Sequence, residues 1–178
     1  MSNYKRIFLD NHYYFLTVII NNRKLTLLTD YINEFKLALK AVKSQYAFDL
    51  HAISVMPDHF HMIIMPNVAK EYPTIIACIK RDFTKSLDKA TRIKLKQNLS
   101  LSKRNKIESG VWQRRYFEHT IRNQEELNHF TDYIHFNPVK HGCVQKAIDW
   151  PYSSFVKFVS NGYYDESWCD FTEGHDYE

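Results

Sequence analysis

Residues 51–66 read HAISVMPDHFHMIIMP, two apolar runs that flank the pair Pro57-Asp58. Runs rich in β-branched and aromatic residues favour strands, and a Pro-Asp pair between them favours a tight turn. We therefore predict a β-hairpin with strands at 48–56 and 59–66. Two strands joined by so short a turn are antiparallel, so the hairpin commits the chain to an antiparallel sheet.

Periodicity predicts the elements on either side of the hairpin. Aromatic and β-branched residues predict strands at 12–22 and 111–121. The stretch 91–110 is polar and basic, and we expect a loop or an interrupted helix there. Apolar residues at helical spacing predict four helices, at 31–46, 74–90, 124–137 and within 149–162. Asp30 is the expected N-cap of the first, and Asn123 and Glu126 are expected to cap the third reciprocally. Pro138 should end or bend the third helix, Gly142 marks a further stop, and Gly162 closes the short last helix.

The predicted order is β-α-β-β-α-β-α, with the hairpin at its centre. This order resembles a split β-α-β layout, an α+β fold in which helices cover mainly one face of a single antiparallel sheet. A chain of 178 residues suits one domain, which we place at 1–162, followed by an acidic C-terminal tail at 163–178.

Charge is distributed unevenly along the chain. Residues 80–106 hold ten Lys or Arg against two acids, whereas residues 158–178 hold six acids and no Lys or Arg. A basic middle followed by an acidic end suggests a polyanionic partner, most commonly nucleic acid. The alternative is a solvated basic helix face.

Other features bound the class of protein. The three cysteines form no C-x-x-C pair, which suggests neither a disulfide framework nor a cysteine-based zinc site. No run reaches the roughly 18 apolar residues of a membrane helix, and the N-terminus lacks an apolar signal region. We expect a cytoplasmic protein with no membrane partner, either a monomer or a homodimer.

His59 and His61 lie two apart in the second strand of the hairpin. Residues two apart on a strand point to the same face, roughly 6.6 Å apart along the backbone. The two imidazoles can therefore converge on one metal ion while Phe60 points into the core. They could equally be fillers on a pleated surface.

A second pattern is YIHFN, residues 133–137. On a helix, Tyr133 and Asn137 are four residues apart, so the hydroxyl and the amide project from one face. The alternative is a packing tyrosine and an asparagine that caps the helix before Pro138.

These stretches resemble a known family. MPDHFHMIIMP is similar to the HUH motif (His, bulky hydrophobic, His) of single-tyrosine transposases. The runs WQRRYFEHTIRN, DYIHFNPVKHG and DWPYSS resemble the REP-associated tyrosine transposases, and the resemblance covers roughly residues 4–165 in the right order.

The resemblance implies an enzyme that cuts and rejoins single-stranded or hairpin DNA on a ferredoxin-like fold. It implies that His59, His61 and Asn137 bind a divalent metal, Mg²⁺ or Mn²⁺, and that Tyr133 is the nucleophile. Attack by the tyrosine would give a 5′-phosphotyrosine that conserves the phosphodiester energy, so that the strand can be rejoined without ATP.

Other residues are candidates for DNA recognition. Trp112, Tyr116 and Phe117 could stack on unpaired bases or pack in the core. His119 could make a structural hydrogen bond or support the site. Six basic side chains could hold phosphates or read guanine edges: Lys80, Arg81, Lys85, Arg114, Arg115 and Arg122.

Two other functions stay open: a transposase-derived DNA-binding protein that no longer cuts, and a metal hydrolase unrelated to nucleic acid. The tail at 163–178 either competes with DNA for a basic groove or packs Trp168 and Phe171 on the core. Truncation after Gly162 separates these roles, because only competition predicts a gain in DNA binding.

Overall fold

A computed structural model describes residues 6–97, 99 and 109–169 of the chain. Four strands form one sheet: β1 Tyr14–Ile19, β2 Phe48–Val55, β3 His59–Pro66 and β4 Phe117–Thr120. Their order is β2-β3-β1-β4, and every neighbouring pair is antiparallel. The predicted hairpin is β2–β3, and the predicted fold class is confirmed.

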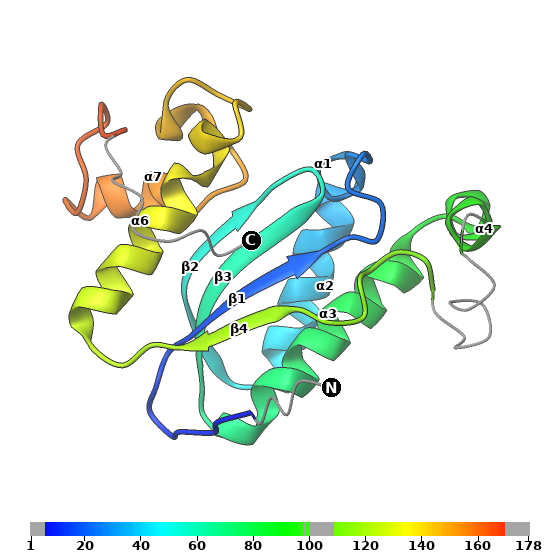
Figure 1. Ribbon diagram of the computed structural model, residues 1–178, viewed down its shortest axis with the longest axis horizontal. Helices are drawn as coiled ribbons and strands as arrows, with labels where there is room; N and C mark the ends of the chain where they lie inside the picture. The colour runs from blue at the N-terminus through cyan, green and yellow to red at the C-terminus, as the bar shows by residue number, and fades with distance from the viewer. Residues whose placement is uncertain (1–5, 98, 100–108, 170–178) are drawn as a thin grey trace.

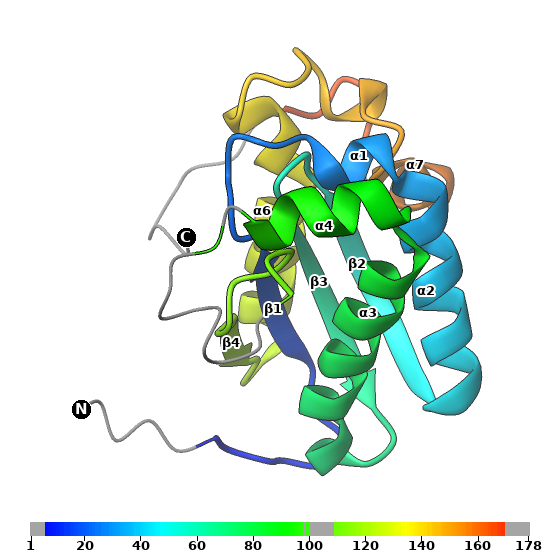
Figure 2. The same cartoon turned by 90° about the vertical axis from the view of Figure 1, so that its right-hand side faces the viewer.

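Helices cover both faces of this sheet (Figures 1 and 2), whereas the sequence predicted helices mainly on one face. The helices α2, Ile32–Gln45, and α3, Tyr72–Ser86, lie on one face. The helix α6, Gln124–Lys140, lies on the other. Shorter helical segments complete the described fold: α1 Leu27–Asp30, η1 Ala69–Glu71, α4 Lys89–Gln97, η2 Ala147–Asp149 and α7 Phe155–Ser160.

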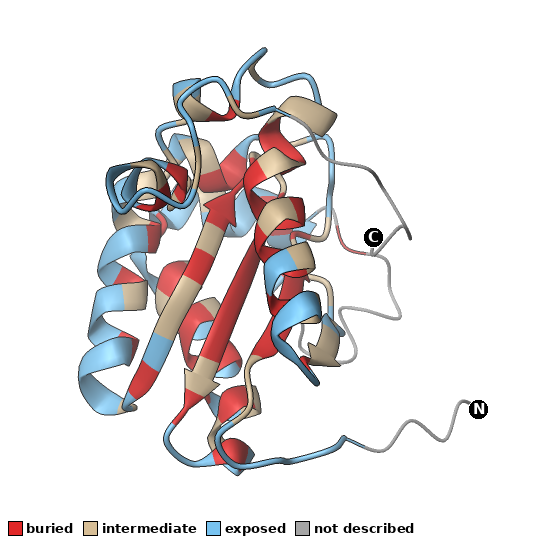
Figure 3. Cartoon of the chain, turned by 90° about the vertical axis from the view of Figure 1, so that its left-hand side faces the viewer, coloured by how far each residue is buried: buried red, intermediate tan, exposed pale blue. Residues whose placement is uncertain are grey.

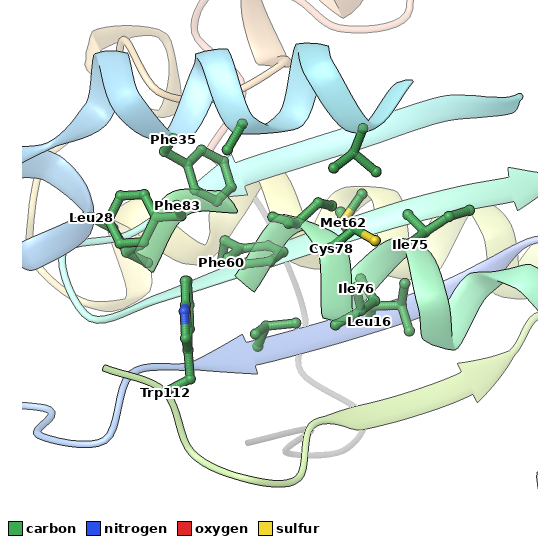
Figure 4. Close-up of a cluster of buried hydrophobic side chains, with 14 of the residues drawn as sticks. Leu16, Leu28, Phe35, Phe60, Met62, Ile75, Ile76, Cys78, Phe83 and Trp112 are labelled. Carbon is green, nitrogen blue, oxygen red and sulfur yellow. The ribbon is translucent and has the colours of Figure 1, made fainter. Parts of the chain in front are cut away.

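The alternation of side chains along β1 and β3 divides the core into two layers. Leu16 and Phe60 point toward α2 and α3, where Leu16 lies beside Ile76 and Phe60 contacts Phe35 (Figure 4). The position of Phe60 in the core was predicted. On the opposite face, residues of the sheet pack against α6 in a second cluster: Phe15, Ala52 and Ile63 with Phe130, Tyr133 and Ile134. The two central strands are consequently buried along most of their length (Figure 3).

The two predicted helix caps have different outcomes. Asn123 caps α6 as predicted, accepting a hydrogen bond from the Glu126 amide at 2.9 Å. The Glu126 carboxylate reaches back to the Arg122 amide rather than to that of Asn123. Asp30 is not a cap, because it lies inside α1 and accepts a hydrogen bond from the Thr26 hydroxyl.

Proline does not end α6. The helix continues past Pro138 to Lys140. The chain leaves the helical path at Gly142, whose φ of +66° suits glycine. Pro138 removes only one amide from the helical ladder, and the His141 amide still bonds the Asn137 carbonyl at 3.0 Å. Asn137 is therefore held inside a helix turn rather than at a loose end.

The segment before β4 differs from the predicted continuous strand at 111–121. Trp112 bridges Ile20, and the chain rejoins the sheet only at Phe117. The preceding Gly110 passes close to α4, where an added Cβ would lie 2.6 Å from the Leu95 carbonyl oxygen. Part of the predicted 91–110 loop is α4 itself, as expected for an interrupted helix, and residues 100–108 lie outside the described residues.

The start of the tail packs on the domain. The Tyr164 hydroxyl donates to Asp132 of α6 at 2.6 Å, and the Trp168 ring stacks on Phe155 at 5.7 Å. This packing agrees with the second role considered for the tail, although Phe171 lies outside the described residues. The competing role stays a prediction. Within the described ranges, no helix is both long and apolar enough to cross a bilayer.

Candidate active site

The strand β3 holds two buried histidines on one face of the sheet. His59 pairs with Ile19, and His61 pairs with Thr17 of β1 and Ser54 of β2. Their side chains are 2% and 0% exposed, and their ring centroids are 4.8 Å apart. The two-residue period therefore brings both imidazoles together, as the sequence predicted.

The helix α6 brings Tyr133 and Asn137 to the same place. The Tyr133 ring lies 5.2 Å from the His61 ring, and Asn137 Oδ1 lies 3.2 Å from His59 Nε2. All four side chains are buried. The four residues that the sequence selected from two separate stretches thus form one cluster between the sheet and α6.

Each histidine is oriented through its Nδ1 atom. His61 Nδ1 shares a 2.9 Å hydrogen bond with Thr17 Oγ1, and His59 Nδ1 lies 2.7 Å from Asp58 Oδ1. The other carboxylate oxygen of Asp58 accepts from Arg23 at 2.8 Å. Burial opposes ionisation of Asp58, but its hydrogen bonds from His59 and Arg23 outweigh burial and lower its pKa to about 2. Asp58 is therefore a carboxylate at neutral pH and fixes the proton of His59 on Nδ1.

The Nε2 sides of both rings fit a cation. With its proton on Nδ1, His59 presents a lone pair on Nε2 to the amide oxygen of Asn137. His61 Nε2 is buried and has no hydrogen-bond partner among the described residues. Burial, followed by the nearby charges of His59, His141 and Lys140, lowers the pKa of His61 well below its ordinary value. The neutral form of imidazole is the one that binds metal, so this cluster suits a divalent ion.

The donor set also indicates which ions suit it. Across the described part of the chain, no three His, Cys, Asp or Glu side chains group as a metal site. The amide of Asn137 brings a neutral oxygen donor next to the histidines, with Oδ1 3.2 Å from His59 Nε2. Two imidazoles and an oxygen leave coordination positions for phosphate and water, a set that Mn²⁺ or Mg²⁺ accepts.

Tyr133 is enclosed by aromatic rings and approached by a cation. Its ring and that of Phe15 pack in a T-shaped pair with centroids 5.9 Å apart, and Lys140 Nζ lies 5.4 Å from the centroid of the Tyr133 ring. The arrangement suits an oxygen nucleophile held beside a metal site.

Four of the predicted DNA-binding residues surround one hollow on the α3 side of the molecule. A cavity of about 200 Å³ is lined by Lys80, Arg81, Trp112 and Arg114 among others. Lys80 donates to the Gln113 carbonyl at 2.7 Å. The remaining three predicted residues do not line this cavity. Lys85 lies one helical turn beyond Arg81, Arg115 is exposed beside Arg114, and Arg122 pairs with Glu126.

The structure distinguishes the three candidate stacking aromatics. Trp112 is 6% exposed, and its indole N–H donates to the Lys80 carbonyl and the Thr84 hydroxyl. Tyr116 packs at the edge of the same core layer. Phe117 is 41% exposed and pairs in register with Thr17, so it stands on the face that carries the site. Of the three, Phe117 is placed best for a base.

Sequence reasoning missed three residues of the site and left one unresolved. Thr17 of β1 bonds His61, 44 residues away, and Arg23 of the following loop bonds Asp58, 35 residues away. Asp58 adjoins His59 in sequence and could have been suspected from the PDH triplet. His119 lies 3.2 Å from Glu126 and contacts the Phe130 ring, which is the structural role considered for it.

Comparison with known proteins identifies the family of this chain. The family model described as "Transposase IS200 like" matches residues 8–137, which include all four clustered residues. The chain belongs to this family. The resemblance to single-tyrosine transposases is thereby confirmed, as is the prediction that the chain is a transposase.

Two relatives among the IS200-like transposases match nearly the whole chain. A REP-associated tyrosine transposase of Escherichia coli is 34% identical over 179 aligned positions, covering 98% of this chain and 97% of the relative. A protein of Haemophilus influenzae assigned to the same group is 42% identical over 169 residues, covering 94% and 93%.

A solved structure agrees with these matches. A REP-associated tyrosine transposase bound to a REP hairpin aligns with a TM-score of 0.79 and 32% identity, over 97% of this chain and 94% of the other. The fold of this IS200-like transposase is therefore that of a hairpin-bound relative along almost its entire length.

Proposed function

We propose that this transposase cuts and rejoins single-stranded or hairpin DNA, with Tyr133 as the nucleophile and REP-like repeats as the substrate class. The observation that supports this best is the meeting of two independent patterns. The His59–His61 pair of β3 faces the Tyr133–Asn137 pair of α6, with 3.2 Å between His59 Nε2 and Asn137 Oδ1. The relative that aligns over 97% of the chain was solved with a REP hairpin, which supports the choice of substrate.

His59, His61 and Asn137 would hold the metal through Nε2, Nε2 and Oδ1. When bound, a divalent ion neutralises charge on the scissile phosphate. The protein keeps this ligand set in place through Thr17 and Asp58, which orient the two rings. Magnesium and manganese both suit the set, and the proposal includes either.

The chemistry is a transesterification. The Tyr133 oxygen loses its proton and forms a bond to phosphorus, while the bond from phosphorus to the 3′-oxygen breaks and that oxygen takes a proton. The 5′-phosphotyrosine retains the ester, so attack by a 3′-hydroxyl reverses the step and rejoins a strand. Lys140 Nζ, 5.4 Å from the centroid of the Tyr133 ring, places a positive charge beside the nucleophile.

A nicking assay on a labelled hairpin oligonucleotide tests this function. We expect a metal-dependent cut and a protein–DNA adduct that survives denaturation. Tight binding of the hairpin without a cut would instead indicate a transposase-derived DNA-binding protein. Failure to bind any single-stranded or hairpin DNA would contradict both.

The basic side chains predict a steep salt dependence of DNA binding. Each phosphate contact on a single strand contributes about 0.7 to the slope of log K against log salt. Replacing the exposed Lys85, Arg114 and Arg115 by Ala should lower that slope by about two. Lys80 is kept because it holds the Gln113 carbonyl. A matched triple change far from this surface, Lys40, Lys146 and Lys157 to Ala, should leave the slope unaltered; equal effects of both triples would place the DNA elsewhere.

The exposed ring of Phe117 predicts a stacking contact with one unpaired base. Phe117→Ala should weaken binding of a cut-proof hairpin by about five-fold or more, because base–aromatic stacking contributes about 1–3 kcal/mol. Phe8→Ala is the matched control, since Phe8 is similarly exposed (39% against 41%) but packs on Tyr72. Hairpins with a single abasic site at successive positions should reveal one position at which loss of the base weakens binding to wild type. The same abasic site should not weaken binding to the Phe117→Ala protein. If every abasic position acts alike in both proteins, Phe117 does not stack on DNA.

A further inference from the structure

A cavity of about 320 Å³ opens next to the proposed metal ligands and has no role in the function described so far. Three segments line it: residues 23–26 of the loop after β1, residues 56–58 of the hairpin turn, and His141 with Cys143 after α6. These segments are far apart in sequence, and they meet at the end of the sheet where β3 begins with His59.

The cavity and the candidate active site share walls. Asp58 lines the cavity and bonds His59 Nδ1 at 2.7 Å, while the His141 ring lies 5.3 Å from the His59 ring. Tyr133, Asn137 and His141 follow one another at intervals of four residues, so they lie along one face of α6 and its end. Two such intervals span about 12 Å along the helix axis. A strand whose phosphate lies beside His59 therefore has a neighbouring nucleotide within reach of the cavity.

The lining matches the chemistry of a nucleotide. Leu25 and Pro57 are partly exposed and give apolar surface for a base, with the buried Met56 behind them. Lys24 and Arg23 stand on the rim, against the single carboxylate of Asp58, which is already engaged by Arg23 and His59. The Lys24 amide donates to Asn22 Oδ1 at 3.2 Å, a local contact within the turn that presents Lys24. A flat apolar group with an adjacent anion fits this combination of surfaces.

We propose that this cavity is the subsite for the nucleotide next to the scissile phosphate, with the base against Leu25 and Pro57 and a backbone phosphate at Lys24. The inference rests on the proposed function, because it needs a DNA strand at the metal ligands. It adds a recognition site for the strand being cut, distinct from the basic hollow beside α3.

The two exposed cysteines make a direct test possible. Cys143 lines the cavity, Cys169 is exposed in the tail, and Cys78 is buried. The Tyr133→Phe protein, which keeps the DNA uncut, is alkylated with iodoacetamide with and without hairpin DNA at about 100 times its dissociation constant. Only about one site in a hundred is then empty. We expect alkylation of Cys143 to slow by about ten-fold or more, and that of Cys169 to stay unchanged, as measured by mass spectrometry of the peptides.

Shortened substrates make the test specific for one nucleotide. Removing the nucleotides on one side of the cut should abolish protection of Cys143 while the hairpin still binds, and removing those on the other side should not. Unchanged alkylation of Cys143 at saturating DNA overturns the subsite. Failure of the protein to bind the hairpin at all would instead overturn the proposed function, so the two failures are distinguishable.

Lys24→Ala tests the phosphate contact independently. On hairpins carrying one neutral methylphosphonate, we expect a single position near the cut that weakens binding roughly three- to five-fold, the range of an exposed charge pair. A methylphosphonate at that position should not weaken binding of the Lys24→Ala protein any further. The Lys40→Ala protein, altered on α2, should lose affinity at that position as the unaltered protein does. Additive losses at every position would rule out the contact between Lys24 and that phosphate.

Discussion

Replacing Tyr133 by Phe is expected to abolish the covalent protein–DNA adduct while binding of hairpin DNA changes by less than about two-fold. The Tyr133 ring is 1% exposed and fits between His61 and Phe15, and phenylalanine preserves both ring contacts. Only the hydroxyl is lost, which is the atom that the proposed reaction joins to phosphorus. Removal of a nucleophile commonly costs several powers of ten in rate, so cleavage should fall by at least about a thousand-fold.

The measurement is denaturing electrophoresis of labelled hairpin DNA with its protein adduct, beside a binding titration on the same oligonucleotide. Tyr164→Phe is the matched control, because it removes the same atom from a partly buried tyrosine that bonds Asp132 outside the site. It should lose some stability and keep cleavage. An adduct formed by Tyr133→Phe at the normal rate would show that another residue is the nucleophile.

Local spacing paired the residues within each stretch, but it left their roles open and could not bring the two pairs together. The period of two joins His59 with His61, and the period of four joins Tyr133 with Asn137. Their meeting depends on α6 packing across β2 and β3 through the layer of Phe15, Ile63 and Phe130. No short-range pattern encodes that contact, and the family resemblance supplied it.

The sequence could not predict which residues pair over long range or which side chains are exposed. Nothing in the local sequence distinguishes Thr17 from other strand residues, and only the β1–β3 register places it against His61. Trp112 and Phe117 look alike in an aromatic run, yet one is buried under α3 and the other exposed, because the chain leaves the sheet between them. Pro138 predicted an end or a bend of the helix, and α6 continues past it to Lys140 because its neighbours supply the remaining hydrogen bonds.

Substitution of either histidine tests the proposed metal site without relying on activity. His59→Ala and His61→Ala should each lose the rise in melting temperature that Mn²⁺ gives the unaltered protein. A ligand that binds only the folded state stabilises it by about 2.7 kcal/mol at 100 times its dissociation constant. Removing one of three protein ligands should therefore take most of that gain away, and metal-dependent cleavage should fall with it. EDTA should mimic both changes in the unaltered protein.

Asn137 makes the prediction sharper, because its proposed role is that of a neutral oxygen ligand. Asn137→Asp keeps the shape and adds a negative charge next to His59 Nε2, 3.2 Å away, so Mn²⁺ should bind more tightly than in wild type. Asn137→Leu fills similar space without an oxygen and should bind less tightly. Calorimetry with Mn²⁺ measures both, and His12→Ala, a histidine outside the cluster that bonds the Asp10 carbonyl, should leave binding unchanged. If Asp and Leu at position 137 affect Mn²⁺ binding equally, the amide is no ligand. If His59→Ala, His61→Ala and both Asn137 variants all bind Mn²⁺ as wild type does, the two histidines only pack together and the metal lies elsewhere.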